Sequence, residues 1–199
     1  MEWIATLGRT MGFSFAAGIN LYATVAILGL ASRYDWVKLP EQFRAFDSDF
    51  IIATAIGLFV IEFIADKIPW FDSVWDTIHT AVRPIGGALI AVTTLGEASP
   101  TMEAVIALMG GSVAATTHFS KAGTRAIANT SPEPFSNWFL SVAEDGFVIG
   151  LSLIALKYPL LAAAVVLVGL IIIAICAAMF VRAIRKWMER RRAARALRA

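Results

Sequence analysis

Long apolar stretches alternate with short polar ones along nearly the whole chain. A straight membrane-crossing helix needs about 20 apolar residues, and the first and last apolar stretches reach that length easily. The second is shorter, and the third is shorter still. The pattern predicts an all-α polytopic membrane protein with broken or re-entrant helices and six apolar segments, at residues 10–32, 50–65, 84–96, 102–118, 139–156 and 159–181.

The third apolar segment leaves two alternatives open. It either extends into the amphipathic stretch before it or forms a half-helix that does not cross alone. Pro69 precedes this amphipathic stretch, and Pro84 with Gly86-Gly87 follows it. Because proline interrupts a helix interior, the stretch between the two prolines is predicted to form a short helix bounded by these breakers.

Composition supports the membrane assignment. Of 199 residues, 58% are hydrophobic and 16% are charged, whereas soluble domains are roughly half apolar. We expect one transmembrane domain over residues 1–181, with possible halves at 1–96 and 102–181, followed by a basic amphipathic tail at 182–199. The single cysteine, Cys176, lies in an apolar run and is predicted to be buried.

Charge distribution predicts the orientation. Eight of the 17 basic residues lie from Arg182 to the C-terminus, so the positive-inside rule places this end in the cytoplasm. Six crossings would return the N-terminus there, with Arg9 on the same side as Lys67 and Arg125. A re-entrant segment would make the number of crossings odd. The tail is expected to contact anionic lipids and no nucleic acid.

Short internal similarities favour a pseudo-repeat. The stretch GGALIAVTT from Gly86 resembles GGSVAATTH from Gly110, and AGINLYAT from Ala17 resembles AGTRAIANT from Ala122. Inverted repeats with interrupted helices are a common plan of secondary transporters. GxxxG spacings at Gly8 and at Gly146 predict close helix packing, and they are compatible with a homo-oligomer.

Two polar stripes stand beside these apolar segments. The mostly acidic stripe contains Glu62 and Asp66, which share a helix face before Pro69, and Asp72, Asp76, His79 and Arg83, which share a face after it. The mostly basic stripe contains His118, Lys121, Arg125 and Asn129. Within each of these three sets the spacing of three or four residues places the members on one helix face. Glu144 and Asp145 add carboxylates at the head of the fifth apolar segment, and Asn20 interrupts the first.

The stripes have complementary charges. Each ionisable group within a membrane costs about 2.5–3.5 kcal/mol on insertion scales, so such groups are retained when they are paired or line a wet cavity. One interpretation therefore has Glu62, Asp66 and Asp76 facing Lys121, Arg125 and Arg83 across a polar cavity. The alternative is a pair of interfacial helices, each solvated on one face.

The first interpretation makes these residues a candidate substrate-binding or ion-binding site. The candidates are Asn20, Glu62, Asp66, Asp76, His79, Arg83, His118, Lys121, Arg125, Asn129, Glu144 and Asp145. His79 or His118 could couple proton movement to transport, because histidine titrates near neutral pH. Asp76, His79 and Glu62 are candidate ligands if a metal binds. No cofactor is indicated.

Several stretches resemble a known family. They are GINLYATVAILGLASR, VIEFIADKIPWFDSVWDTIHTAVRPIGGAL, KAGTRAIANTSPEPFSN and AEDGFVIG. They look like the bacterial integral-membrane family called domain of unknown function four-one-two-six, over about residues 12–160. The resemblance implies a small protein of the bacterial inner membrane, and it implies no activity.

The favoured function is that of a small transporter or channel for a cation or a proton-coupled solute. Lipid-phosphate handling by a flippase or an enzyme is one alternative, since Arg83, Lys121 and Arg125 could bind phosphate. A scaffold locked by ion pairs is another. The sequence contains no HExxH, P-loop, GxSxG or Cys/His zinc pattern, so we lean against an enzyme.

Overall fold

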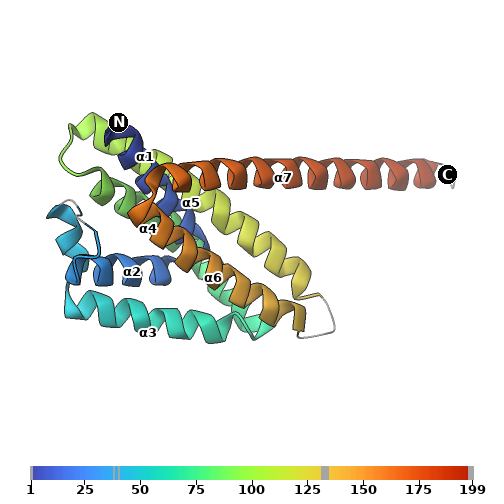
Figure 1. Cartoon of the computed structure of the whole chain (residues 1–199). Coiled ribbons are helices and arrows are strands. Elements are labelled where there is room, and N and C mark those ends of the chain that lie inside the picture. Colours follow the sequence, from blue (N-terminus) through green and yellow to red (C-terminus); the bar gives the residue numbers. More distant parts are fainter. Residues whose placement is uncertain (1, 38, 40, 131–134, 197–199) are drawn as a thin grey trace.

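The computed structural model describes residues 2–37, 39, 41–130 and 135–196, and its elements are helical throughout (Figure 1). No strand occurs among these residues, which confirms the all-α prediction. Pro132 and Pro134 predict an extended turn, but residues 131–134 lie outside the described residues. The elements are α1 (Glu2–Ile19), α2 (Leu21–Arg33), the 3-10 helix η1 (Glu41–Phe46), α3 (Asp49–Ala65), α4 (Pro69–Leu95), α5 (Pro100–Ala128), α6 (Phe135–Lys157) and α7 (Pro159–Ala196).

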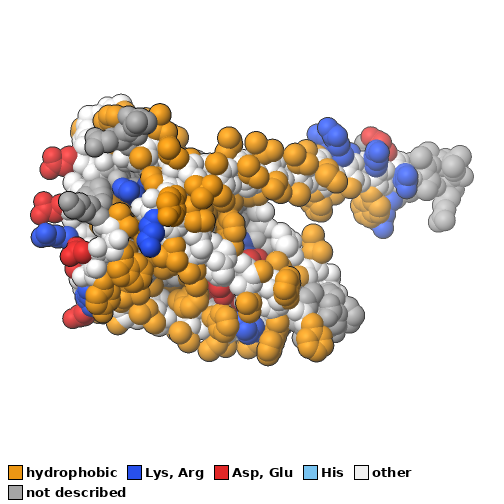
Figure 2. Space-filling view, in the orientation of Figure 1, with side chains coloured by type: hydrophobic (Ala, Val, Ile, Leu, Met, Phe, Trp, Pro, Cys, Tyr) orange, Lys and Arg blue, Asp and Glu red, His pale blue; other side chains and the backbone are white. Residues whose placement is uncertain are grey.

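Within the described part of the chain, three helices are long and apolar enough to cross a membrane. They cover Trp70–Leu95, Asn137–Lys157 and Pro159–Arg191. Figure 2 shows hydrophobic side chains spread over the flank of the bundle and along much of α7, with charged side chains near the far part of that helix. A surface this apolar is expected of a protein whose solvent is lipid.

The first predicted segment is not a single helix. It divides at Asn20, whose backbone is extended, with φ −145° and ψ 100°. The start of α1 lies beside the α6–α7 junction, because Arg9 Nε donates to the Ala155 carbonyl at 3.4 Å. The end of α2 lies at the start of α3, where Arg33 Nε donates to Asp47 at 2.8 Å. The chain therefore enters the bundle along α1, turns at Asn20 and returns along α2 to the same end (Figure 1).

This end, which we call the η1 end, also holds η1 and the connection from α4 to α5. The opposite end, the Asp66 end, holds the connection from α3 to α4 and the start of α6, where Arg125 Nη1 donates to the Asp66 carbonyl at 3.1 Å. The prediction that Arg9 lies on the same side as Lys67 and Arg125 is therefore wrong. The cause is the break at Asn20, which turns the chain back.

The prediction that α4 is broken at Pro84 is also wrong. Pro84 lies inside one continuous helix, so the third segment extends into the amphipathic stretch before it. A proline within a helix costs about 3 kcal/mol or more, and close packing on α5 offsets this cost. A Cβ on Gly87 would lie 2.4 Å from Ala114 Cβ, and one on Gly111 would lie 3.2 Å from the Pro84 carbonyl oxygen.

Small residues also bring α1 against the end of α6 and the start of α7. A Cβ on Gly8 would lie 2.2 Å from the Pro159 carbonyl oxygen, and one on Gly12 would lie 2.8 Å from Ala155 Cβ. The close packing predicted for this GxxxG pair is confirmed. Gly146 and Gly150 instead face open space within the chain. Cys176 is exposed on α7, so the prediction that it is buried is wrong.

Candidate functional site

Arg83 on α4 lies at the centre of a buried ionic network. Its Nη2 contacts Glu62 Oε1 on α3 at 2.6 Å, and its Nη1 contacts Asp76 Oδ1 at 3.2 Å. The side chains of Arg83 and Glu62 have no exposed surface. Charge-assisted bonds of this kind are the strong ones, so the pair fixes α3 against α4.

Lys121 extends the network to α5 and α1. Its Nζ donates to Glu62 Oε1 at 3.2 Å and to Asp66 Oδ2 at 3.0 Å. The third acceptor is the carbonyl oxygen of Ile19 at 3.3 Å, next to the break between α1 and α2. One ammonium group therefore ties the break to Glu62 of α3 and to Asp66, the residue that ends α3.

Arg125, one turn further along α5, completes the network. Its Nη2 contacts Asp66 Oδ2 at 2.8 Å and Glu144 Oε2 on α6 at 3.0 Å. Its Nη1 donates to Asn137 Oδ1 at 2.7 Å. Acidic and basic side chains of four helices thus form one connected set, which we call the ionic core: Glu62, Asp66, Asp76, Arg83, His118, Lys121, Arg125 and Glu144.

Two further buried carboxylates are held by amides instead of cations. Asn20 Nδ2 donates to Asp145 Oδ1 at 3.0 Å. Asn129 Nδ2 donates to Asp72 Oδ2 at 2.7 Å. The second oxygen of each carboxylate, Asp145 Oδ2 and Asp72 Oδ1, is buried without a hydrogen-bond partner among the described residues. These two carboxylates therefore flank the ionic core without a neutralising ion pair.

The hydrogen bonds of the two histidines determine their tautomers. Arg83 Nη1 lies 2.8 Å from His118 Nδ1, and because arginine only donates, Nδ1 must carry a lone pair. His118 Nε2 then donates to Thr80 Oγ1 at 3.1 Å. His79 Nδ1 donates to the Trp75 carbonyl at 2.7 Å, and its Nε2 lies 2.8 Å from the Tyr22 hydroxyl, from which it accepts when the ring is neutral. The lone pair on Nδ1 makes the His118 ring neutral in this arrangement.

The predicted pairing of the two stripes is confirmed. Arg83 meets Glu62 and Asp76, while Lys121 and Arg125 meet Asp66. The alternative of helices solvated on one face is excluded for these members, because they are buried. The twelve predicted residues divide into the eight of the ionic core and four flanking ones: Asn20, Asp145, Asn129 and His79.

Sequence reasoning left out several residues that complete the site. Asp72 belongs to the predicted acidic stripe but not to the predicted site residues, although its spacing from Asp76 indicates a shared face. Asn137 lies twelve positions after Arg125, and no spacing rule connects them because 131–134 intervene. Tyr22 stood two positions after Asn20, and Thr80 one after His79; neither carried a signal beyond this proximity.

The candidate metal ligands do not converge. Glu62 and Asp76 each direct an oxygen to Arg83, and His79 is directed to Tyr22 and Trp75. Among the described residues, no three side chains of His, Cys, Asp or Glu form a group that could hold a metal ion. The geometry thus points away from these three residues as a metal site.

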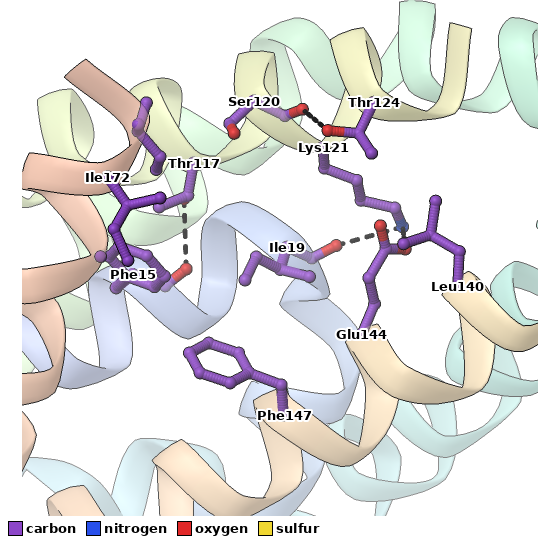
Figure 3. A pocket seen from close by; sticks show the side chains of 12 residues that line it. Phe15, Ile19, Thr117, Ser120, Lys121, Thr124, Leu140, Glu144, Phe147 and Ile172 are labelled. Atoms are coloured by element: carbon purple, nitrogen blue, oxygen red, sulfur yellow. Dashed lines mark hydrogen bonds and ion pairs between the residues drawn. The ribbon is translucent and has the colours of Figure 1, made fainter. Parts of the chain in front are cut away.

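Two cavities reach the site from different sides of α5. The Asp72 pocket, of about 280 Å³, lies between α4 and α5 and is lined by Asp72, Asp76, Thr80, Arg125 and Asn129 among others. The Glu144 pocket, also about 280 Å³, lies between α1, α5, α6 and α7 (Figure 3). Its polar side contains Lys121 and Glu144. Arg125 connects the two, since it lines the first and bonds Glu144 of the second.

Comparison with known proteins gives a family and no activity. Residues 7–179 match the family described as "Domain of unknown function (DUF4126)". The chain belongs to this family. Among curated proteins and among solved structures, no significant match was found. Membership confirms the resemblance that the polar stretches carry, and any function must be argued from the site itself.

Proposed function

We propose that this protein is a membrane transporter or channel that moves a cation, or a small solute coupled to protons, through the ionic core. One observation carries the proposal: the core has more buried carboxylates than cations, and apart from Arg83 Nε the nitrogens of its basic side chains are bonded, while four carboxylate oxygens of the core and its flanks have no hydrogen-bond partner among the described residues. Such a site favours a proton or another cation over an anion.

The donors of Lys121 and Arg125 are directed at the protein, whereas Arg83 Nε is buried without a partner among the described residues. Lysine has three N–H donors, and Lys121 contacts the Ile19 carbonyl, Glu62 and Asp66. Each of the three guanidinium nitrogens of Arg125 is bonded to a carboxylate, an amide or a carbonyl oxygen. A phosphate group would have to displace these partners, which weakens the alternative of lipid-phosphate handling.

The acceptors are in excess. Six carboxylates line the core and its flanks, and the core has three cations, Arg83, Lys121 and Arg125. When Lys67 at the rim is included, the number of cations is four. Four carboxylate oxygens are buried without a hydrogen-bond partner among the described residues: Glu62 Oε2, Asp66 Oδ1, Asp72 Oδ1 and Asp145 Oδ2. A buried acceptor without a partner is costly, and a proton or cation would remove that cost.

The break at Asn20 supports a transport role. We propose that α1 and α2 form a re-entrant pair and that α3 to α7 cross the membrane, with the termini on opposite sides. The N-terminus of α2 faces Asp145 through Asn20, and a helix N-terminus favours negative charge. Interrupted helices at mid-membrane are typical of transporter binding sites.

The carboxylates are the proposed proton carriers. A proton added to His118 would have to occupy Nδ1, which accepts the bond from Arg83. His79 likewise receives the Tyr22 hydroxyl on its free nitrogen. The histidines therefore position Arg83 and Tyr22. Asp72 and Asp145 have an unpartnered oxygen each and are the best placed to accept a proton.

Orientation and partners complete the proposal. The tail after Arg182 carries a dense basic charge, so it is placed in the cytoplasm and against anionic lipids of an inner membrane. This leaves the η1 end outside. Gly146 and Gly150 face open space on α6, where a second copy of the chain could pack.

Flux in reconstituted vesicles tests the proposal. The purified protein is placed in liposomes containing a pH-sensitive dye, and a membrane potential or a gradient of Na⁺ or K⁺ is imposed. We expect proton movement above that of empty liposomes, reduced about tenfold or more by Asp145→Asn or Asp72→Asn, since each removes a titrating group. Glu97→Gln, at an exposed position, should leave it unchanged.

The contrary result is equally clear. If wild-type vesicles match empty ones for protons and for each cation gradient, the proposal is wrong. The better explanation would then be a scaffold protein, in which the ion pairs serve only to specify helix packing.

A further inference from the structure

We propose that the Glu144 pocket binds hydrophobic organic cations that enter sideways from the lipid. This inference names a substrate class for the proposed transporter and so rests on the proposed function. It is carried by the position of the pocket, by its walls and by the charge at its polar end.

The walls of the pocket are mainly apolar and aromatic. Phe15, Ile19, Leu140, Phe147 and Ile172 contribute to them. The rings of Phe15 and Phe147 meet edge to face, with centroids 6.1 Å apart. Aromatic faces attract cations as well as apolar groups, so these walls suit a ligand that has a hydrophobic body and a positive charge.

The pocket opens where α7 leaves the bundle. Ile172 is 55% exposed and Phe147 is 42% exposed, although both line the pocket. Beyond Ile173, every residue of α7 whose side chain is described is exposed. Figure 1 shows α7 diverging from α6 along this part. In a membrane, the opening is therefore a lateral gap that faces acyl chains, and a lipid-soluble ligand reaches it without passing through water.

The polar end of the pocket has the character of an acceptor. Figure 3 shows Lys121 and Glu144 together at this end, with the ammonium also turned to the Ile19 carbonyl. The three shorter contacts of Lys121 leave Glu144 at 4.0 Å. Lys121 therefore has no spare donor for an anionic head group. Glu144 Oε2 is already paired with Arg125 Nη2 at 3.0 Å, so the other carboxylate oxygen of this side chain, which is 14% exposed, is the atom available to a ligand.

Charge complementarity selects a cation over a neutral or anionic amphiphile. Glu144 belongs to the ionic core, which has four carboxylates against three guanidinium and ammonium groups, and the amide-held carboxylates Asp72 and Asp145 flank this core. In a low-dielectric surrounding, the field of this excess acts over several ångströms. A delocalised cation loses little hydration on entering the lipid, so it can reach the pocket and be held by that field.

Binding of tetraphenylphosphonium to the purified protein in lipid nanodiscs tests the inference, with tetraphenylborate as a probe of the same shape and opposite charge. We expect saturable binding of the phosphonium only. Glu144→Gln should weaken it about tenfold or more, where tenfold corresponds to about 1.4 kcal/mol. A nanodisc preparation keeps the lateral opening in contact with lipid.

A matched pair of variants addresses the walls without touching the charge. Ile172 lines the pocket, whereas the neighbouring Ile171 does not and is similarly exposed, at 50% against 55%. Ile172→Trp should fill the opening and weaken phosphonium binding about tenfold. Ile171→Trp should leave it unchanged. Equal binding by the two variants, or equal binding of the two probes to the wild type, would overturn the inference.

Flux measured on the same preparations separates the two proposals. Proton or cation flux without phosphonium binding would overturn the proposed substrate class and support the proposed transport function. Phosphonium binding that depends on Glu144 and Ile172, without any flux, would keep the cation site and remove transport. Absence of both would overturn both.

Discussion

The side-chain amide of Asn20 joins the break between α1 and α2 to Asp145 of α6. Its Nδ2 donates to Asp145 Oδ1 at 3.0 Å, while its Oδ1 accepts from the backbone of Ala23 at 2.9 Å. One residue therefore caps the N-terminus of α2 and holds a buried carboxylate that forms no ion pair with the described residues. The position of the break and the position of the carboxylate depend on each other.

Replacement of Asn20 should affect both functions of its side chain. Asn20→Ala removes the cap, which costs about 1 kcal/mol, and leaves Asp145 without its donor, which costs about 1–3 kcal/mol more. We expect the free energy of unfolding, measured by denaturant titration in detergent, to fall by roughly the sum.

An exchange of the two side chains provides the control. In the double variant Asn20→Asp with Asp145→Asn, the amide still donates to a carboxylate, and aspartate still caps α2. We expect this variant to recover most of the lost stability, whereas Asn20→Asp alone, which places two carboxylates together, should not. A double variant as unstable as Asn20→Ala would contradict this account of the pair.

A double-mutant cycle on Arg83 and Glu62 should show strong coupling. Removing one member of a buried ion pair costs about 3–5 kcal/mol, because it leaves an unpaired buried charge. Arg83→Met and Glu62→Leu should each be that costly, and together they should cost clearly less than the sum. Their coupling energy, from the same titration, is expected to exceed 1 kcal/mol.

The exposed pair of Arg44 and Glu41 supplies the comparison for this cycle. Their charged groups lie 3.8 Å apart, with side chains 78% and 83% exposed. Such surface pairs contribute about 0–1 kcal/mol. Coupling no larger for Arg83 and Glu62 than for this pair would show that the ionic core does not hold α3 against α4.

At Gly18, α1 packs closely against α5. A Cβ there would lie 2.3 Å from the Ala114 carbonyl oxygen, so Gly18→Ala must push the helices apart. Overpacking of this kind costs about 1–3 kcal/mol. Gly57, inside α3, has nothing within 4 Å, and Gly57→Ala should stabilise the protein by about 0.5–1 kcal/mol. Thermal unfolding of both variants checks the contrast, which would fail if they shifted in the same direction.

Cysteine labelling tests the orientation of the termini. In a Cys176→Ala background, Trp3→Cys and Glu41→Cys lie at exposed positions of the η1 end. A membrane-impermeant maleimide added to intact cells should label both. Arg185→Cys, on the exposed tail of α7, should react only after permeabilisation. If Trp3→Cys and Arg185→Cys reacted under the same condition, both termini would lie on one side and the number of crossings would be even.

The composition of the candidate site could largely be predicted from the sequence. Helical spacing alone places Glu62 with Asp66 and Lys121 with Arg125, and the energetic cost of unpaired charge in lipid then predicts that the two stripes meet. The carboxylates held by amides could not be predicted, because Asn20 lies 125 positions from Asp145. A contact of that range depends on where whole helices pack. An inverted repeat remains a prediction.

The sequence by itself determined that the chain is helical and apolar, and that its ionisable groups must find partners. These properties follow from local periodicity and from the transfer of side chains into lipid. Only the tertiary structure decided that Asn20 divides the first segment and that Pro84 does not divide α4. Both residues disturb a helix locally. Glycine and alanine contacts with α5 stabilise the continuous form at Pro84, while the Ala23 and Asp145 contacts stabilise the break at Asn20.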